Sequence, residues 1–106
     1  MPKEYREITF DMEEIGEAML DYAAAQSPEL SIERTSDIRV ETDGLAIVFD
    51  EEHEMRFSQL EITAALIRHA KKIGVPVARK ARKALVPGKS GITLRLWLPD
   101  MGQESA

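Results

Sequence analysis

The sequence predicts an α+β fold of two layers, in which a mostly antiparallel sheet of about six short strands carries two helices on one face. Two stretches repeat apolar residues with the period of a helix, and the stretches between them alternate apolar and polar residues as half-buried strands do. Sliding the chain by 47 residues superimposes both patterns. This superposition indicates a tandem β-α-β-β repeat with a pseudo-twofold relation.

A single domain spanning residues 1–106 is expected, because a chain of this length with 43% hydrophobic residues can enclose one core. Its longest apolar run, residues 45–49, is far shorter than the ~20 residues of a membrane span. The first ten residues carry charges where a signal peptide is apolar, so we expect a cytoplasmic protein that makes no membrane contact. The absence of cysteine excludes disulfides, thiol nucleophiles and thiolate metal sites.

Repeat unit one is expected over about residues 4–50. It begins with a strand at residues 5–10, in which Tyr5, Ile8 and Phe10 supply apolar bulk. Asp11 and Glu14 have the spacing of a capping box, which predicts a helix over residues 12–26. The apolar face of this helix is expected to contain Met12, Ile15, Met19, Leu20 and Ala23.

The second half of unit one is expected to be a β-hairpin. Residues 37–42 alternate in polarity, and residues 45–49 supply the returning strand. The dipeptide Asp43-Gly44 between them is typical of a hairpin turn. The acidic run that follows, residues 50–54, is expected to form a solvated turn.

Repeat unit two is expected over about residues 53–98. Without any gap, the superposition pairs identical residues: Phe10 with Phe57, Glu14 with Glu61, Ile15 with Ile62, Ala18 with Ala65, Ala23 with Ala70 and Gly44 with Gly91. Apolar residues of the helices and strands also fall on apolar residues. The agreement in helix face and strand phase is what favours a duplication over chance similarity.

The second helix is expected to begin after Ser58, which forms a capping box with Glu61, and to continue to Ile73. Gly74 and Pro76 then end it, since glycine tolerates the left-handed cap and proline cannot continue the helix. The apolar face of this helix is expected to contain Ile62, Leu66, Ile67, Ala70 and Ile73.

Residues 77–84 are compatible with either helix or strand. We expect one helical turn after Pro76, then a strand at residues 82–86 that pairs with residues 92–98 across a loop at 87–91. Residues 99–106 are expected to be a frayed tail. In the last strand, alternation points Ile92, Leu94, Leu96 and Leu98 inward and Thr93, Arg95 and Trp97 outward.

One segment has part of a phosphate-binding motif. Gly88-Lys89-Ser90 matches the end of the pattern G-x-x-x-x-G-K-[ST], but Lys83 occupies the position of the first glycine. The motif must also open a helix, whereas a strand is expected here. An ordinary hairpin loop is therefore the favoured interpretation.

Neither histidine indicates a catalytic or metal site. His53 lies in an acidic turn whose adjacent side chains rarely converge on one ion. His69 occupies the edge of its helix's apolar face, at the position of Tyr22 in unit one, which favours a packing role. We therefore predict a protein that is not an enzyme, with no catalytic residues, no cofactor and no metal.

Charge is strongly segregated along the chain. Residues 1–61 carry 17 acidic and 5 basic residues, a balance of −12, whereas residues 62–106 carry 2 acidic and 9 basic residues, a balance of +7. The halves attract each other, whether within one chain, between subunits or through an outside partner. The predicted partner-binding residues lie in the basic half: Arg68, Lys72, Arg79, Lys80, Arg82, Lys83, Arg95 and Trp97.

These observations predict a small non-catalytic module that acts through protein–protein contacts or self-association, with a homodimer formed through an open sheet face or an edge strand. The alternative is polyanion or nucleic-acid binding through the basic cluster at residues 68–95, with Trp97 beside Arg95 as a stacking surface. The acidic first half weakens this alternative, because it would repel a phosphate polymer.

Overall fold

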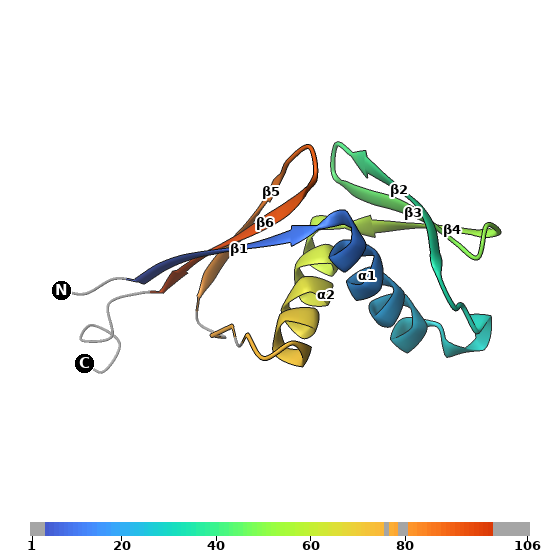
Figure 1. The fold of residues 1–106 in the computed structure, drawn as a ribbon, viewed down its shortest axis with the longest axis horizontal. Helices are drawn as coiled ribbons and strands as arrows, with labels where there is room; N and C mark the ends of the chain where they lie inside the picture. Colours follow the sequence, from blue (N-terminus) through green and yellow to red (C-terminus); the bar gives the residue numbers. More distant parts are fainter. Residues whose placement is uncertain (1–3, 76, 79–80, 99–106) are drawn as a thin grey trace.

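The computed structural model describes residues 4–75, 77–78 and 81–98 (Figure 1). The helices and strands are β1 (Glu4–Asp11), α1 (Met12–Gln26), the short 3-10 helix η1 (Pro28–Leu30), β2 (Thr35–Glu41), β3 (Gly44–Phe49), β4 (His53–Ser58), α2 (Gln59–Lys72), β5 (Arg82–Pro87) and β6 (Gly91–Leu98). The predicted α+β class is confirmed. Within residues 77–84 the strand begins at Arg82. Of the helical turn expected after Pro76, residues 77–78 are not helical, and residues 79–80 lie outside the described residues.

The strands form two antiparallel sheets of three strands each, in the orders β1-β6-β5 and β2-β3-β4. The expectation of one six-stranded sheet is therefore wrong. Each sheet combines a hairpin with the first strand of the other half of the chain, so the two hairpins belong to different sheets. Splitting the strands in this way lets the inner faces of both sheets contribute to one buried cluster with the two helices.

The helices lie side by side beneath the strands in the view of Figure 1. The core that they share with the sheets contains Phe10, Ile15, Met19, Leu45, Ile47, Phe49, Ile62, Leu66 and Leu94, all of them buried. Ile73, expected on the apolar face of the second helix, is instead 51% exposed. It is the C-cap of α2, and the chain turns away at Gly74, whose φ of 86° lies in the left-handed region.

Both predicted capping boxes are confirmed. The Asp11 carboxylate accepts a hydrogen bond of 2.8 Å from the Glu14 backbone N–H, and the Glu14 carboxylate accepts one of 3.1 Å from the Asp11 N–H. Ser58 and Glu61 repeat the arrangement at 3.2 and 3.0 Å. Asp11 and Ser58 are also the last residues of β1 and β4, so strand and helix join without a connecting loop.

Gly44 lies in β3 rather than in the hairpin turn, which consists of Thr42 and Asp43. A Cβ atom on Gly44 would stand only 1.8 Å from the carbonyl oxygen of Phe57. The sequence interpretation of Gly44 as a turn residue is therefore wrong. Its lack of a side chain is required by the close approach of β4.

The acidic turn is shorter than expected, because β4 already begins at His53. Asp50 and Glu51 have φ angles of 53° and 60°, which reverse the chain tightly. The Asp50 carboxylate accepts hydrogen bonds from the backbone N–H groups of Glu33 and Arg34, at 3.0–3.1 Å. Asp50 thus fixes the approach to β2. In the described part of the chain, neither helix has the length and apolar character to cross a membrane.

Candidate functional site

The predicted partner-binding residues do not form one patch. Arg82 lies on β5 with Lys83, and Arg95 lies on β6 with Trp97. The other two described members, Arg68 and Lys72, lie on α2. Arg79 and Lys80 lie outside the described residues. Two separate surfaces result, one on the sheet β1-β6-β5 and one beside the helices.

The first surface, which we name the aromatic face, consists of Tyr5 and Glu7 on β1, Arg95 and Trp97 on β6, and Arg82 on β5. Trp97 is the register partner of both Tyr5 and Arg82, and Arg95 is the partner of Glu7. Because side chains alternate along a strand, all five point to the same side of the sheet. The intervening residues of β6, Ile92, Leu94 and Leu96, are buried on the opposite side, which confirms their predicted phase.

The two aromatic rings of this face lie against each other and remain accessible. The ring centroids of Tyr5 and Trp97 are 5.5 Å apart, with the planes inclined at 48°. Tyr5 is 49% exposed and Trp97 is 39% exposed. The sheet therefore presents a contiguous aromatic surface to solvent, beside the exposed Arg82.

Charge on the aromatic face has both signs. The Arg95 Nε atom lies 3.5 Å from a carboxylate oxygen of Glu7. Partial burial raises the pKa of the Tyr5 phenol above its ordinary value; the Glu7 carboxylate adds to this effect, while Arg95 opposes it. Lys83 has the other strand phase, and its Nζ donates to the carbonyl oxygen of Ala81 at 2.8 Å. Lys83 therefore does not belong to this face.

Sequence reasoning missed Tyr5 and Glu7. It interpreted Tyr5 as bulk for the same strand as Ile8 and Phe10, although Tyr5 has the opposite phase. Phe10 is fully buried, so residues at odd positions of β1 must point outward. That alternation was the available signal, and it would have placed Tyr5 and Glu7 on the outer face.

The outer face of the other sheet differs in chemistry. Arg56 lies 3.3 Å from the carboxylate of Glu41 and 3.9 Å from that of Glu54, and Arg39 forms an ion pair with Glu54. Opposite charges on this sheet are thus already paired with each other. These exposed pairs contribute little stability, but they leave the face without a surplus of positive charge.

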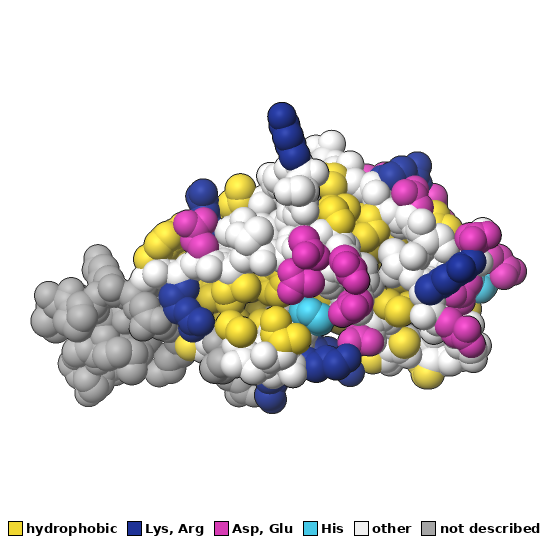
Figure 2. All heavy atoms as spheres, in the orientation of Figure 1, with side chains coloured by type: hydrophobic (Ala, Val, Ile, Leu, Met, Phe, Trp, Pro, Cys, Tyr) yellow, Lys and Arg dark blue, Asp and Glu magenta, His cyan; other side chains and the backbone are white. Residues whose placement is uncertain are grey.

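A second surface, the interhelical hollow, lies between α1 and α2 and has a volume of about 850 Å³. Its lining consists of Ala18, Asp21, Ala24 and Ala25 from α1 and Ala65, Arg68, His69, Lys71 and Lys72 from α2. Lys72 Nζ lies 3.0 Å from the Asp21 carboxylate and links the two helices. Figure 2 shows acidic side chains gathered over α1 and Lys and Arg side chains below them, near the end of α2.

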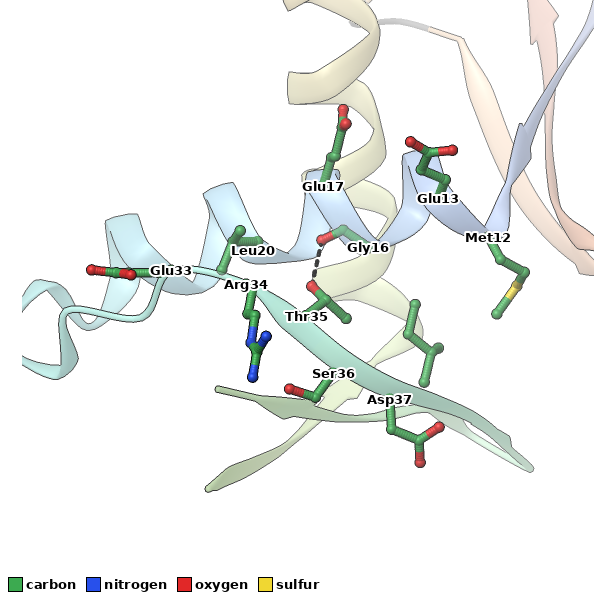
Figure 3. Close-up of a pocket in the computed structure, with 11 residues that line it drawn as sticks. Met12, Glu13, Gly16, Glu17, Leu20, Glu33, Arg34, Thr35, Ser36 and Asp37 are labelled. Carbon is green, nitrogen blue, oxygen red and sulfur yellow. Dashed lines mark hydrogen bonds between the residues drawn. The ribbon is translucent and has the colours of Figure 1, made fainter. Parts of the chain in front are cut away.

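A third concave region, of about 520 Å³, lies between α1 and β2 (Figure 3). The Thr35 hydroxyl donates to the carbonyl oxygen of Gly16 at 2.9 Å and joins β2 to α1 within this region. In Figure 3 the carboxylates of Glu13 and Glu17 rise on one side of α1, whereas Asp37 points away beyond β2. These acids do not converge, and the residues described by the structure contain no His, Cys, Asp and Glu group suited to a metal ion.

Gly88-Lys89-Ser90 lies in the turn between β5 and β6. The Gly88 N–H donates to the carbonyl oxygen of Gly91 at 2.8 Å, and a strand follows rather than a helix. The backbone amides that would cradle a phosphate at a helix N-terminus are therefore not arranged here. The hairpin interpretation of this segment is confirmed.

His69 is buried, and its ring lies 6.1 Å from that of Phe10 in an edge-on contact. This contact agrees with the packing role that the sequence favoured.

Comparison with known proteins adds no assignment: no protein-family model matches the chain, and no curated protein or solved structure matches it.

Proposed function

We propose that the chain is a non-catalytic protein-binding module that self-associates through the aromatic face. The observation that carries this proposal is the exposed Tyr5–Trp97 pair with Arg82 and Arg95 beside it. Trp, Tyr and Arg dominate the binding energy of protein interfaces, since their large rigid groups exclude much water when covered. Isolated exposed aromatic residues are common on protein surfaces, but a contiguous pair flanked by arginines is typical of a contact surface.

A second copy of the chain fits this face because the face is self-complementary in charge. A twofold contact brings the same patch of both copies together, so that residue i of one copy meets residue j of the other. Glu7 of one copy would face Arg82 of its partner, and the reverse pair would form as well. The aromatic pairs would then meet near the centre, where water is best excluded.

The second candidate function is binding of single-stranded nucleic acid by the same face. Bases stack on exposed aromatic rings, and Arg82 would contact the phosphates. Glu7 argues against this ligand, because its carboxylate already faces Arg95 and reduces the positive potential. The net charge of −5 repels a polyanion as well.

We infer in addition that the chain is a duplicated β-α-β-β unit with a pseudo-twofold relation. Gly44 approaches Phe57 as Gly91 approaches Phe10. The Tyr22–Phe57 and His69–Phe10 ring contacts, with centroids 6.2 and 6.1 Å apart, are a further corresponding pair. The aromatic face is then a feature of the sheet β1-β6-β5 that the duplicated sheet β2-β3-β4 does not share, because the outer face of β2-β3-β4 carries ion pairs instead.

Sedimentation velocity over a range of concentrations tests the proposed self-association. We expect a dimer that dissociates on dilution, and Trp97→Ala should shift the equilibrium to monomer. Val40→Ala is the matched control, because Val40 is similarly exposed, at 54%, but lies on β2 of the other sheet. A monomer at every concentration, or a dimer unaffected by Trp97→Ala, would contradict the proposal. Salt-sensitive binding of oligothymidine by a monomer would favour the second candidate instead.

A further inference from the structure

We propose that the interhelical hollow binds a small organic anion with an apolar body. This site is separate from the aromatic face and does not depend on self-association. Its volume of about 850 Å³ falls within the range of small-molecule sites, about 300–1,000 Å³.

The apolar part of the ligand would rest on alanine side chains. Ala18, Ala24 and Ala25 on α1 and Ala65 on α2 line the hollow, and their single methyl groups leave the space between the helices unfilled. Ala18 and Ala65 are buried, which gives the hollow an apolar floor. A short aliphatic or small cyclic group would cover this surface and remove it from water.

The charge of the hollow selects an anion. Three cations line it, and among the described residues the Asp21 carboxylate pairs with Lys72 alone. Arg68 and Lys71 form no ion pair with any other described residue, and both are exposed. An anionic group between them would gain charge-assisted hydrogen bonds, whereas a cationic ligand would be repelled.

His69 supplies an independent indication of a ligand. It lines the hollow, its side chain is only 5% exposed, and its buried Nδ1 has no hydrogen-bond partner within the described part of the chain. A buried polar atom without a partner is uncommon in folded proteins. A carboxylate or phosphate oxygen entering beside Arg68 would be an acceptor for an imidazole N–H.

The test uses octanoate as the probe, followed by NMR of alanine methyl groups and of the His69 imidazole. We expect saturable shifts confined to the hollow. Acetate, which lacks the apolar body, and octylamine, which reverses the charge, should bind far more weakly. Octyl phosphate distinguishes the anionic group: tighter binding than octanoate would identify a phosphate ligand, and weaker binding a carboxylate.

Substitutions separate this site from non-specific attraction. The double variant Arg68→Gln, Lys71→Gln should bind octanoate about tenfold more weakly, because two charged donors are lost. Lys89→Gln is the matched control, since Lys89 is an exposed cation in the β5–β6 turn. Asp21→Asn should tighten binding, as it removes a repelling carboxylate and releases Lys72.

Three results would overturn the proposal: octanoate shifts outside the hollow, equal affinity in the double variant and Lys89→Gln, or unchanged affinity in Asp21→Asn. Binding of an acidic helical peptide in the hollow without any octanoate binding would also overturn it, in favour of a protein ligand. The monomeric Trp97→Ala variant should retain full octanoate affinity. This result would show that anion binding in the hollow does not require self-association through the aromatic face.

Discussion

Gly91 lies so close to Phe10 that a Cβ atom on Gly91 would stand 2.0 Å from the Phe10 carbonyl oxygen. Gly91→Ala should therefore force the two strands apart and lower the free energy of unfolding by about 2–3 kcal/mol. Gly44→Ala should have a similar effect through Phe57. Urea denaturation measures both. Gly88→Ala is the control, because its nearest contact of 3.6 Å is an ordinary one, and a loss as large there would contradict the steric explanation.

Complementary charge reversal tests the twofold contact on the aromatic face. Glu7→Arg and Arg82→Glu should each abolish the dimer when studied alone, because like charges then meet in both halves of the contact. A mixture of the two variants should form a heterodimer, since every pair is opposite in sign again. Sedimentation of the mixture measures this recovery. If the mixture stays monomeric although both variants are folded, Glu7 and Arg82 do not face each other.

The pKa of Tyr5 gives a prediction at high pH. The pKa is raised from 10.0 mainly by partial burial; the Arg95 guanidinium lowers it, and the Glu7 carboxylate raises it. The folded protein therefore keeps the Tyr5 proton at a pH where the unfolded chain loses it, so folding should become less favourable as the pH rises through 10 and beyond. Ultraviolet titration of tyrosinate, with Tyr5→Phe to assign the signal, measures the pKa. Glu7→Gln should lower it, and an unchanged value would contradict the role of Glu7.

The strand order predicts how separated halves of the chain behave. β1 pairs with β6, and β4 pairs with β3, so each half lacks a strand of its own sheet. Segments 1–50 and 51–106 should therefore show little stable structure when expressed separately and should regain it on mixing. Circular dichroism of the parts and of the mixture measures this. Independent cooperative folding of either half would show that the paired strand is dispensable.

The local parts of the fold were predictable because their signals are local. Asp11 and Ser58, each three residues before a glutamate, predicted both helix starts, and alternation predicted the inward side chains of β6. The division into two sheets was not predictable, because strand phase shows which face is buried and not which strand lies beside it. Likewise, Gly44 carries a hairpin signal in sequence, while its close approach to Phe57 exists only after distant strands have paired.

The candidate sites were predictable to the same extent. Residues on one strand could be found from the sequence, whereas residues that strand pairing brings together could not. Arg95 and Trp97 were identified from their outward phase, whereas Tyr5 is distant in sequence and joins them only through the pairing of β1 with β6. The basic residues lie close together in sequence, but the sequence does not show on which side of the fold each side chain lies. The structure instead places Arg68 beside the helices and Arg82 on the sheet, which separates them into two surfaces.

Asp11 and Ser58 each serve as the end of a strand and the cap of a helix, and this double role limits how the chain can vary in length. One residue inserted after either position would turn the following helix by about 100°, because an α-helix has 3.6 residues per turn. That rotation would carry buried side chains to the surface and move the alanine walls of the hollow apart. The two strand-to-helix junctions therefore set the rotation of both helices relative to the sheets.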